Sequence, residues 1–222
     1  MILKNKFFLL IFFFIILTTY NSNEQKKNFS IIFPIKEITI ENTFFFDLTK
    51  LKSELEFLRN TSLFFLNEKK IIKTIVKFDF ISTIQLKKKY PNTLKIIISE
   101  QVPVAIESTG KGRHYITKDG KKITYVELDV FKNLPTIFGN HKNFSSFFNE
   151  LEKNNFNISR IKSFYYFDVG RWDIILKDYK TIKLPQANYE NILKELDSIL
   201  NDSSFFKYKI FDYRIKDQLI LR

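Results

Sequence analysis

The chain has 222 residues and a formal net charge of +12, from 36 lysines and arginines against 24 aspartates and glutamates. This length, with 45% hydrophobic residues, is sufficient for one or two domains with cores of ordinary size. A positive charge of this size suggests nucleic acid or an anionic membrane as a partner. We discount nucleic acid, because 26 phenylalanines beside 5 glycines indicate a general compositional bias in which lysine fills exposed positions. The lysine-rich run over residues 68–95 is then a solvated face or, as a functional alternative, a contact with anionic headgroups.

Residue types that carry chemistry are sparse. The absence of cysteine excludes disulfides, thiolate metal sites and a cysteine nucleophile. His114 and His141 lack partners at zinc-site spacing, so both are expected to be structural or surface residues. Ser145 and Ser146 open a predicted helix without the Gly-x-Ser-x-Gly sequence of a nucleophile elbow, and scattered glycines offer no phosphate-binding loop. Dispersed carboxylates cannot be paired from the sequence, and we predict a protein without enzymatic activity, metal or cofactor.

An apolar segment opens the chain. Residues 7–17 are all apolar, and Lys4 and Lys6 precede them. Residues 2–20 would span roughly 28 Å as a helix, close to a hydrocarbon core of ~30 Å. We therefore expect an uncleaved transmembrane anchor over residues 1–20, with a cleaved signal peptide as the alternative, although no Ala-x-Ala-like site follows. The lysine distribution mildly favours a cytoplasmic N terminus, with the rest of the chain outside the cytoplasm.

A polar linker, residues 21–32, separates this segment from a predicted small domain over residues 33–101. Pro34 precedes a predicted strand over residues 35–40. Asp47 or Thr49 is the expected N-cap of a leucine-rich helix reaching residue 58, and Asn67 the cap of a second helix over residues 68–78. Two amphipathic helices need an apolar sheet face to cover, which indicates an α+β domain.

A β-hairpin over residues 81–88 and 93–100 completes this domain. Its second strand is rich in β-branched residues and lies between Pro91 and Pro103, and proline is tolerated at strand starts and edges but not in central ladders. Tyr90, Pro91 and Asn92 supply the turn. The predicted order is therefore strand, helix, helix, strand, strand.

Residues 102–222 are predicted to form a second, mainly antiparallel β domain with two helices. Asp119-Gly120 joins strands over residues 113–117 and 121–125, and Gly170 joins strands over residues 158–166 and 171–176. Helical spacing covers residues 144–154 and 188–200, and further strands are expected over residues 181–184, 207–214 and 218–221. Trp172 is expected in the core, with Arg171 pointing to the opposite face by strand alternation.

Four segments, taken in order, resemble the FtsQ/DivIB family of bacterial division proteins. The first is residues 88–105, with the pattern basic residue, aromatic, Pro, x, Thr-Leu, alternating strand, Glu, x, x, Pro-Val-Ala. The others are the Leu-Pro-x-x-x-Gly loop at 134–139, the Arg-Trp strand at 171–176 with its Leu-Pro exit at 184–185, and Phe-Asp-Tyr-Arg at 211–214, followed by Asp217 and Arg222. Tyr90 stands where the family commonly has tryptophan, Gln101 where it has a basic residue, and residues 177–180 where it has glycines. The resemblance implies a POTRA domain directly after a membrane anchor.

The resemblance also implies a non-catalytic scaffold of the division complex. Such a protein is a single-pass inner-membrane protein at the septum, with a cytoplasmic N terminus and a periplasmic body, and it links the coiled-coil proteins FtsB and FtsL to septal peptidoglycan synthesis. It has no nucleic-acid partner and no small-molecule substrate. The alternative is a secreted or outer-membrane-associated POTRA chaperone or interaction module, which would require cleavage near Ser22.

The resemblance also implies a partner-binding region. Transferred by position from the family to this sequence, that region consists of one arginine and the segment that ends in the last strand. A final strand is expected at a sheet edge, where a partner strand can add. Tyr213 and Ile215 would lie on one face as anchors for that strand, whereas Leu219 and Leu221 would in the alternative reading simply close the core. The expected contact residues are Arg171, Tyr213, Arg214, Ile215, Lys216, Asp217, Gln218, Leu219, Ile220 and Leu221.

Overall fold

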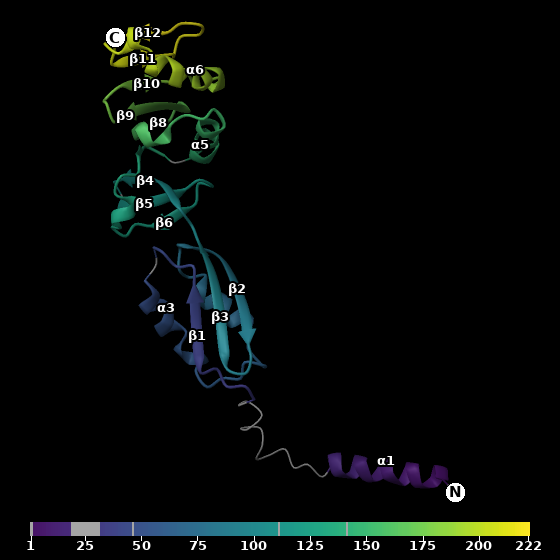
Figure 1. Cartoon of the computed structure of the whole chain (residues 1–222). Helices are drawn as coiled ribbons and strands as arrows, with labels where there is room; N and C mark the ends of the chain where they lie inside the picture. Colours follow the sequence, from purple (N-terminus) through teal and green to yellow (C-terminus); the bar gives the residue numbers. More distant parts are fainter. Residues whose placement is uncertain (1, 19–31, 46, 111, 141) are drawn as a thin grey trace. The chain divides into compact units, whose positions relative to one another are not determined.

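The computed structural model describes residues 2–18, 32–45, 47–110, 112–140 and 142–222 (Figure 1). The chain divides into two compact units, Met1–Glu100 and Gln101–Arg222. His141 and all but the last residue of the predicted linker over residues 21–32 lie outside the described residues.

The first element is helix α1 (Ile2–Thr18), whose 17 residues coincide with most of the predicted anchor. The side chains of residues 8–17 are exposed, although all are large and apolar. Within the described residues, no helix is both long enough and apolar enough to cross a membrane. Thr19 and Tyr20, which belong to the predicted anchor, lie outside the described residues.

The rest of the first unit is a three-stranded sheet covered by short helices. Strand β3 (Thr93–Glu100) lies in the middle, parallel to β1 (Glu37–Glu41) and antiparallel to β2 (Ile81–Lys89). Between β1 and β2 the chain forms α3 (Leu48–Glu54), the 3-10 helix η1 (Glu56–Leu58) and α4 (Glu68–Ile75). The predicted order of strand, helix, helix, strand, strand is confirmed.

The helix boundaries follow from side-chain caps. The Asp47 carboxylate accepts from the backbone N–H of Thr49 at 2.8 Å, and the Asn67 side chain accepts from that of Lys70 at 3.1 Å. The prediction that the second helix reaches residue 78 is wrong, because it ends at Ile75. The N–H of Phe78 bonds to the Ile75 carbonyl at 3.1 Å, a turn that redirects the chain toward β2. The core beneath these helices contains Ile35, Leu51, Leu55, Leu58, Leu63, Ile71, Ile75, Ile81, Leu94, Ile96 and Ile98.

The second unit is built on one nine-stranded sheet with the order β12-β11-β10-β9-β8-β7-β4-β5-β6. The pairs β4·β7, β7·β8 and β10·β11 are parallel, and the other five are antiparallel. The strands are β4 (Pro103–Thr109), β5 (Gly112–Thr117), β6 (Lys122–Thr124), β7 (Thr136–Phe138), β8 (Ile161–Phe167), β9 (Arg171–Leu176), β10 (Thr181–Lys183), β11 (Ile210–Asp212) and β12 (Ile220–Leu221).

Several strand predictions need correction. Strands β4 and β7 were not predicted, because Pro103 and Pro135 read as breaks in the chain. Pro103 in fact begins β4, where the register shifts by one residue, and Pro135 immediately precedes β7. The strands expected over residues 207–214 and 218–221 shorten to three and two residues. The 3-10 helix η3 (Ile158–Arg160) takes the start of the strand expected from residue 158.

Helices α5 (Phe144–Lys153) and α6 (Glu190–Asn201) pack on one face of this sheet (Figure 1). The predicted core position of Trp172 is confirmed, since the residue is 3% exposed. Its ring stacks on that of Phe147 from α5, with centroids 5.0 Å apart and an interplanar angle of 6°. The opposite face of β9, β10 and β11 carries Arg171, Asp173, Thr181, Lys183 and Asp212 together with the partly exposed Ile175 and Ile210, so it is mainly polar.

Candidate partner-binding edge

Strand β12 forms one edge of the nine-stranded sheet, and among the described residues it pairs only with β11. Arg222, directly after it, exchanges two backbone hydrogen bonds with Ile210, at 2.9 and 3.1 Å. In an antiparallel pair such hydrogen-bonded positions alternate with positions whose N–H and C=O groups point away. Ile220 therefore bonds inward to Asp212, whereas Leu221 and, by continued alternation, Leu219 direct their N–H and C=O groups outward. The edge thus presents a row of backbone donors and acceptors.

A tight turn connects β11 to β12. Asp217 has a positive φ of 57°, and the N–H of Gln218 bonds to the Ile215 carbonyl at 3.2 Å. The expectation that Tyr213 and Ile215 share a strand face does not hold, because β11 ends at Asp212 and strand alternation stops there. Tyr213 packs against the core, whereas Ile215 is 51% exposed in the turn.

The Tyr213 hydroxyl is buried and has no hydrogen-bond partner among the described residues. Burial, with a smaller contribution from Glu195 of α6, raises the pKa of Tyr213 to about 12. The hydroxyl therefore stays protonated at physiological pH. A buried donor without an acceptor is rare in folded proteins, and because the chain itself covers this hydroxyl, a partner at the surface does not reach it.

A ladder of charged side chains runs across the polar sheet face toward the edge. Asp173 of β9 lies opposite Lys183 of β10, which lies opposite Asp212 of β11, which lies opposite Ile220. Opposite charges on adjacent strands attract, so the order of alternating signs stabilises this register. We refer to Asp173, Lys183 and Asp212 as the charge ladder.

Arginines complete both ends of the charge ladder. The Arg214 guanidinium donates to Asp212 through Nε at 2.8 Å and Nη2 at 2.6 Å, a two-point contact that fixes the carboxylate. Arg171 donates from Nε to Asp173 Oδ1 at 3.2 Å, and its guanidinium lies 4.3 Å from the Phe167 ring centroid. Both side chains are almost inaccessible to solvent, at 8% exposed for Asp173 and 6% for Asp212.

The two carboxylates respond differently to this environment. Hydrogen bonds from Arg214 lower the pKa of Asp212, whereas burial raises the pKa of Asp173 despite the nearby Arg171. Asp212 therefore stabilises the folded state at pH values above its unfolded-state pKa. This stabilisation is lost as the pH falls through its lower folded-state pKa. Asp173 shows the reverse dependence: its raised pKa favours the folded state at low pH and loses that effect as the pH rises.

Arg171 does not join the edge directly. Two strands, β10 and β11, separate its strand from β12, which corresponds to about 14 Å at ~4.8 Å per strand. The structure brings Tyr213, Arg214 and the segment up to Leu221 together in one hairpin, and connects Arg171 to it only through the charge ladder. The side chain of Arg171 is also only 21% exposed, less than expected for a free arginine on a binding face.

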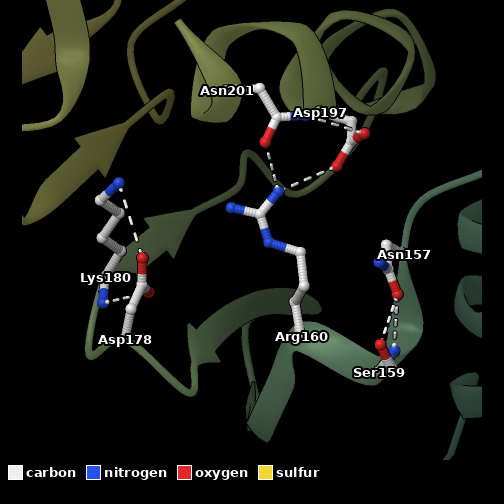
Figure 2. Close-up of polar contacts among 7 residues, drawn as sticks. All are labelled: Asn157, Ser159, Arg160, Asp178, Lys180, Asp197 and Asn201. Carbon is white, nitrogen blue, oxygen red and sulfur yellow. Dashed lines mark hydrogen bonds and ion pairs between the residues drawn. The ribbon is translucent and has the colours of Figure 1, made fainter. Parts of the chain in front are cut away.

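Polar contacts hold α6 against η3, the short helix before β8, and also stabilise the β9–β10 turn. Figure 2 shows Arg160 reaching from η3 to α6, where its Nη1 lies 2.9 Å from Asn201 Oδ1 and 3.2 Å from Asp197 Oδ1. In the β9–β10 turn, Lys180 is buried and lies 3.5 Å from Asp178, as the same view shows. The helix beside the hairpin is thus fixed by side chains as well as by its apolar face.

Candidate metal ligands do not gather in the described parts of the chain. Across residues 2–18, 32–45, 47–110, 112–140 and 142–222, no group of three or more histidines, aspartates or glutamates could hold a metal ion. His114 lies in β5, opposite the buried Glu107 of β4, and its Nδ1 is buried without a hydrogen-bond partner in the described structure.

The two units match two family models in chain order. Residues 33–101 match the POTRA domain of FtsQ type, and residues 105–214 match the C-terminal domain of the cell division protein FtsQ/DivIB. The chain belongs to the FtsQ/DivIB family. The cell division protein FtsQ of Rickettsia bellii (strain RML369-C) is 27% identical over 190 residues, which cover 84% of this chain and 71% of that protein.

Other FtsQ proteins show similar relationships. That of Rickettsia typhi (strain ATCC VR-144 / Wilmington) is 25% identical over 194 residues, or 86% of this chain and 73% of the relative. That of Rhizobium meliloti (strain 1021) is 24% identical over 162 residues, or 71% of this chain and 52% of the relative. The family resemblance inferred from the sequence is confirmed.

In this FtsQ/DivIB chain, the partner-binding residues predicted from the sequence did not include the three residues of the charge ladder. Part of the signal was present: Asp173 follows Arg171 at a spacing of two, and Arg214 follows Asp212 at the same spacing, although Arg214 lies beyond the end of β11. It was missed because pairing between β9, β10 and β11 joins segments far apart in the chain, and no local pattern specifies which strands are neighbours.

Proposed function

We propose that this chain is a membrane-anchored scaffold of the bacterial division complex that binds an FtsB-type coiled-coil protein, together with an FtsL-type protein, at β12. An extended segment of the partner adds to the sheet as a further strand beside β12, and α6 contributes to the contact. Through this partner, the scaffold connects the division complex to septal peptidoglycan synthesis. The observation that carries the proposal is the unpaired edge of β12, with the outward backbone groups of Leu219 and Leu221.

The surroundings of β12 support strand addition as the mode of binding. Main-chain hydrogen bonds supply affinity in this mode, and side-chain pockets on alternate positions supply specificity. Ile220 is half-buried beside Asp212, so an incoming strand would meet an apolar side chain next to a fixed charge. The exposed Ile215 offers a further apolar contact at the turn end of the hairpin.

We further propose that α1 anchors the chain in the inner membrane at the septum, with its N terminus in the cytoplasm and both folded units in the periplasm. Lys4 and Lys6 would reach the headgroups at the cytoplasmic side. Scaffolding requires no reaction chemistry, and we propose that the protein acts by binding alone, without a cofactor.

A pull-down tests the proposal. The full chain and a chain ending at Lys216 are each incubated with short coiled-coil membrane proteins from the same cell. We expect the full chain to retain an FtsB-type partner and the truncated chain to lose it, because β12 is absent. Circular dichroism controls for the fold. Retention of the partner by the truncated chain would exclude β12 as the site, and failure of the full chain to bind any such protein would exclude the division-scaffold function.

A further inference from the structure

One end of the first unit exposes several aromatic side chains. This is the end at which β2 finishes, β3 begins and the chain enters β1 (Figure 1). Phe33, Phe64, Phe65 and Tyr90 are 41, 56, 60 and 52% exposed, and Phe57 is 38% exposed. Large aromatic residues are seldom left so exposed in a group, and such patches usually mark interaction sites. We refer to these five residues as the aromatic end.

Direct contacts show that the aromatic end is continuous. The rings of Phe33 and Tyr90 lie 5.0 Å apart, and those of Phe64 and Phe65 lie 4.9 Å apart. The N–H of Leu63 donates to the Phe33 carbonyl at 2.8 Å, which joins the two ring pairs. Phe57 and Phe65 line one hollow of about 470 Å³. The two ring pairs and Phe57 therefore lie at the same end of the domain, joined by a backbone hydrogen bond and by a shared hollow.

Positive charge surrounds this surface. Lys70 lines the same hollow, with its Nζ 4.3 Å from the Phe57 ring centroid, and Lys36 and Lys89 are exposed beside the entry to β1 and the β2–β3 turn. Among the described residues, these three lysines have no ion pair, whereas Glu56 and Glu68 nearby are paired with Arg59 and Lys88.

The opposite end of the same domain has acidic character. Glu41 ends β1, Asp47 begins α3, and Glu100 ends β3. The separation of charge is partial, because the opposite end also carries the exposed Lys77, between α4 and β2. The three cations without an ion pair in the described structure nevertheless gather around the aromatic end, beside one exposed carboxylate, that of Glu37 at the start of β1. A surface with interspersed lysines and aromatic rings is complementary to anionic lipid, because rings favour the headgroup region and lysines favour phosphates.

The chain length also favours a bilayer as the occupant. Thirteen residues, 19–31, separate Thr18 of α1 from Ile32, where the chain enters the aromatic end. Fully extended, they could reach no further than about 45 Å. If α1 lies in a membrane, the aromatic end is held at a high effective concentration near that surface, so even weak lipid contacts become populated.

We propose that the aromatic end docks on the surface of an anionic lipid bilayer, with the phenyl and phenol rings in the headgroup region and Lys36, Lys70 and Lys89 against lipid phosphates. This rests on the proposed function in one respect, that α1 holds the chain at the membrane. Docking would fix the orientation of the first unit relative to the membrane.

The absence of cysteine makes the test direct, since one introduced cysteine can be labelled cleanly. The full chain is reconstituted in nanodiscs containing phosphatidylglycerol and phosphatidylcholine, with an environment-sensitive fluorophore at Lys69→Cys, beside the aromatic end, or at Ser99→Cys, at the opposite end. Doxyl-labelled lipid serves as the quencher. We expect quenching at position 69 to exceed that at position 99 at least threefold, and to fall in nanodiscs of phosphatidylcholine alone.

The double variant Phe64→Ser/Phe65→Ser should reduce quenching at position 69 to the level at position 99. The matched control Phe44→Ser changes another exposed phenylalanine, 80% exposed at the opposite end, and should leave the quenching unchanged. Equal quenching at both positions in chains that co-elute with nanodiscs would overturn this inference alone. A spectral shift without lipid quenching would assign the surface to a protein or a second copy, and also overturn it. Failure to co-elute would contradict the proposed anchor as well.

Discussion

Replacing Ile220 by glutamate is expected to weaken binding of the FtsB-type partner about 30-fold or more, equivalent to ~2 kcal/mol for a central interface residue. Ile220 lies on the edge strand directly opposite Asp212, whose carboxylate is buried and held by Arg214. A second carboxylate here repels the first and must lose its water when a partner strand covers it. Titration calorimetry or surface plasmon resonance would measure the change.

The matched control is Val169→Glu. Val169 is 62% exposed in the turn between β8 and β9, so the same kind of change is made away from the edge. We expect the control to leave affinity within about twofold, and both variants to unfold within a few degrees of the unchanged protein, since neither residue is fully buried. Equal losses of affinity in both variants would indicate a nonspecific charge effect and contradict binding at β12.

Replacing Trp172 by alanine is expected to lower the unfolding free energy of the second unit by about 3–5 kcal/mol. The ring stacks on Phe147 and also contacts Phe144, Phe164 and Tyr166, so its removal opens a cavity between the sheet and α5. Urea unfolding should be followed by circular dichroism, because Trp172 is the only tryptophan and its fluorescence disappears with the substitution.

Phe167→Ala is the control for that experiment. Phe167 belongs to the same β8–β9 hairpin but is 39% exposed, and we expect its removal to cost about 1 kcal/mol or less. If the two variants lost similar amounts of stability, the aromatic cluster around Trp172 would not be the main core of this unit. The comparison thus separates burial in the core from aromatic character.

Local signals in the sequence predicted most elements, but not the arrangement of the long sheet. Asn67 and the Asp119-Gly120 pair each determine structure over a few residues, and they correctly placed a helix start and a hairpin. Strand β7 was missed because both of its neighbours, β4 and β8, pair with it in parallel from distant parts of the chain, where the partner and not the local pattern determines whether a strand forms. Strand β4 was missed because Pro103 indicated a break, although β4 also forms an antiparallel hairpin with the adjacent β5.

For the candidate site, too, some features were predicted from the sequence and others were not. The position of β12 at the sheet edge agrees with the expectation from the sequence, since a short final strand has few neighbours to pair with. The expected shared face of Tyr213 and Ile215 failed because strand alternation requires a strand, and β11 is only three residues long. The charge ladder was missed because the spacing of its aspartates and arginines in the sequence does not indicate which strands lie beside one another.

Backbone hydrogen exchange at β12, measured with and without the partner, tests strand addition most directly. In the free protein, the inward amides of Ile220 and Arg222 should exchange slowly, and the outward amides of Leu219 and Leu221 should exchange rapidly. Binding of the FtsB-type partner is predicted to slow exchange at Leu219 and Leu221 at least about tenfold, because their N–H groups then bond to the added strand. Unchanged exchange at these two amides in the saturated complex would contradict the account.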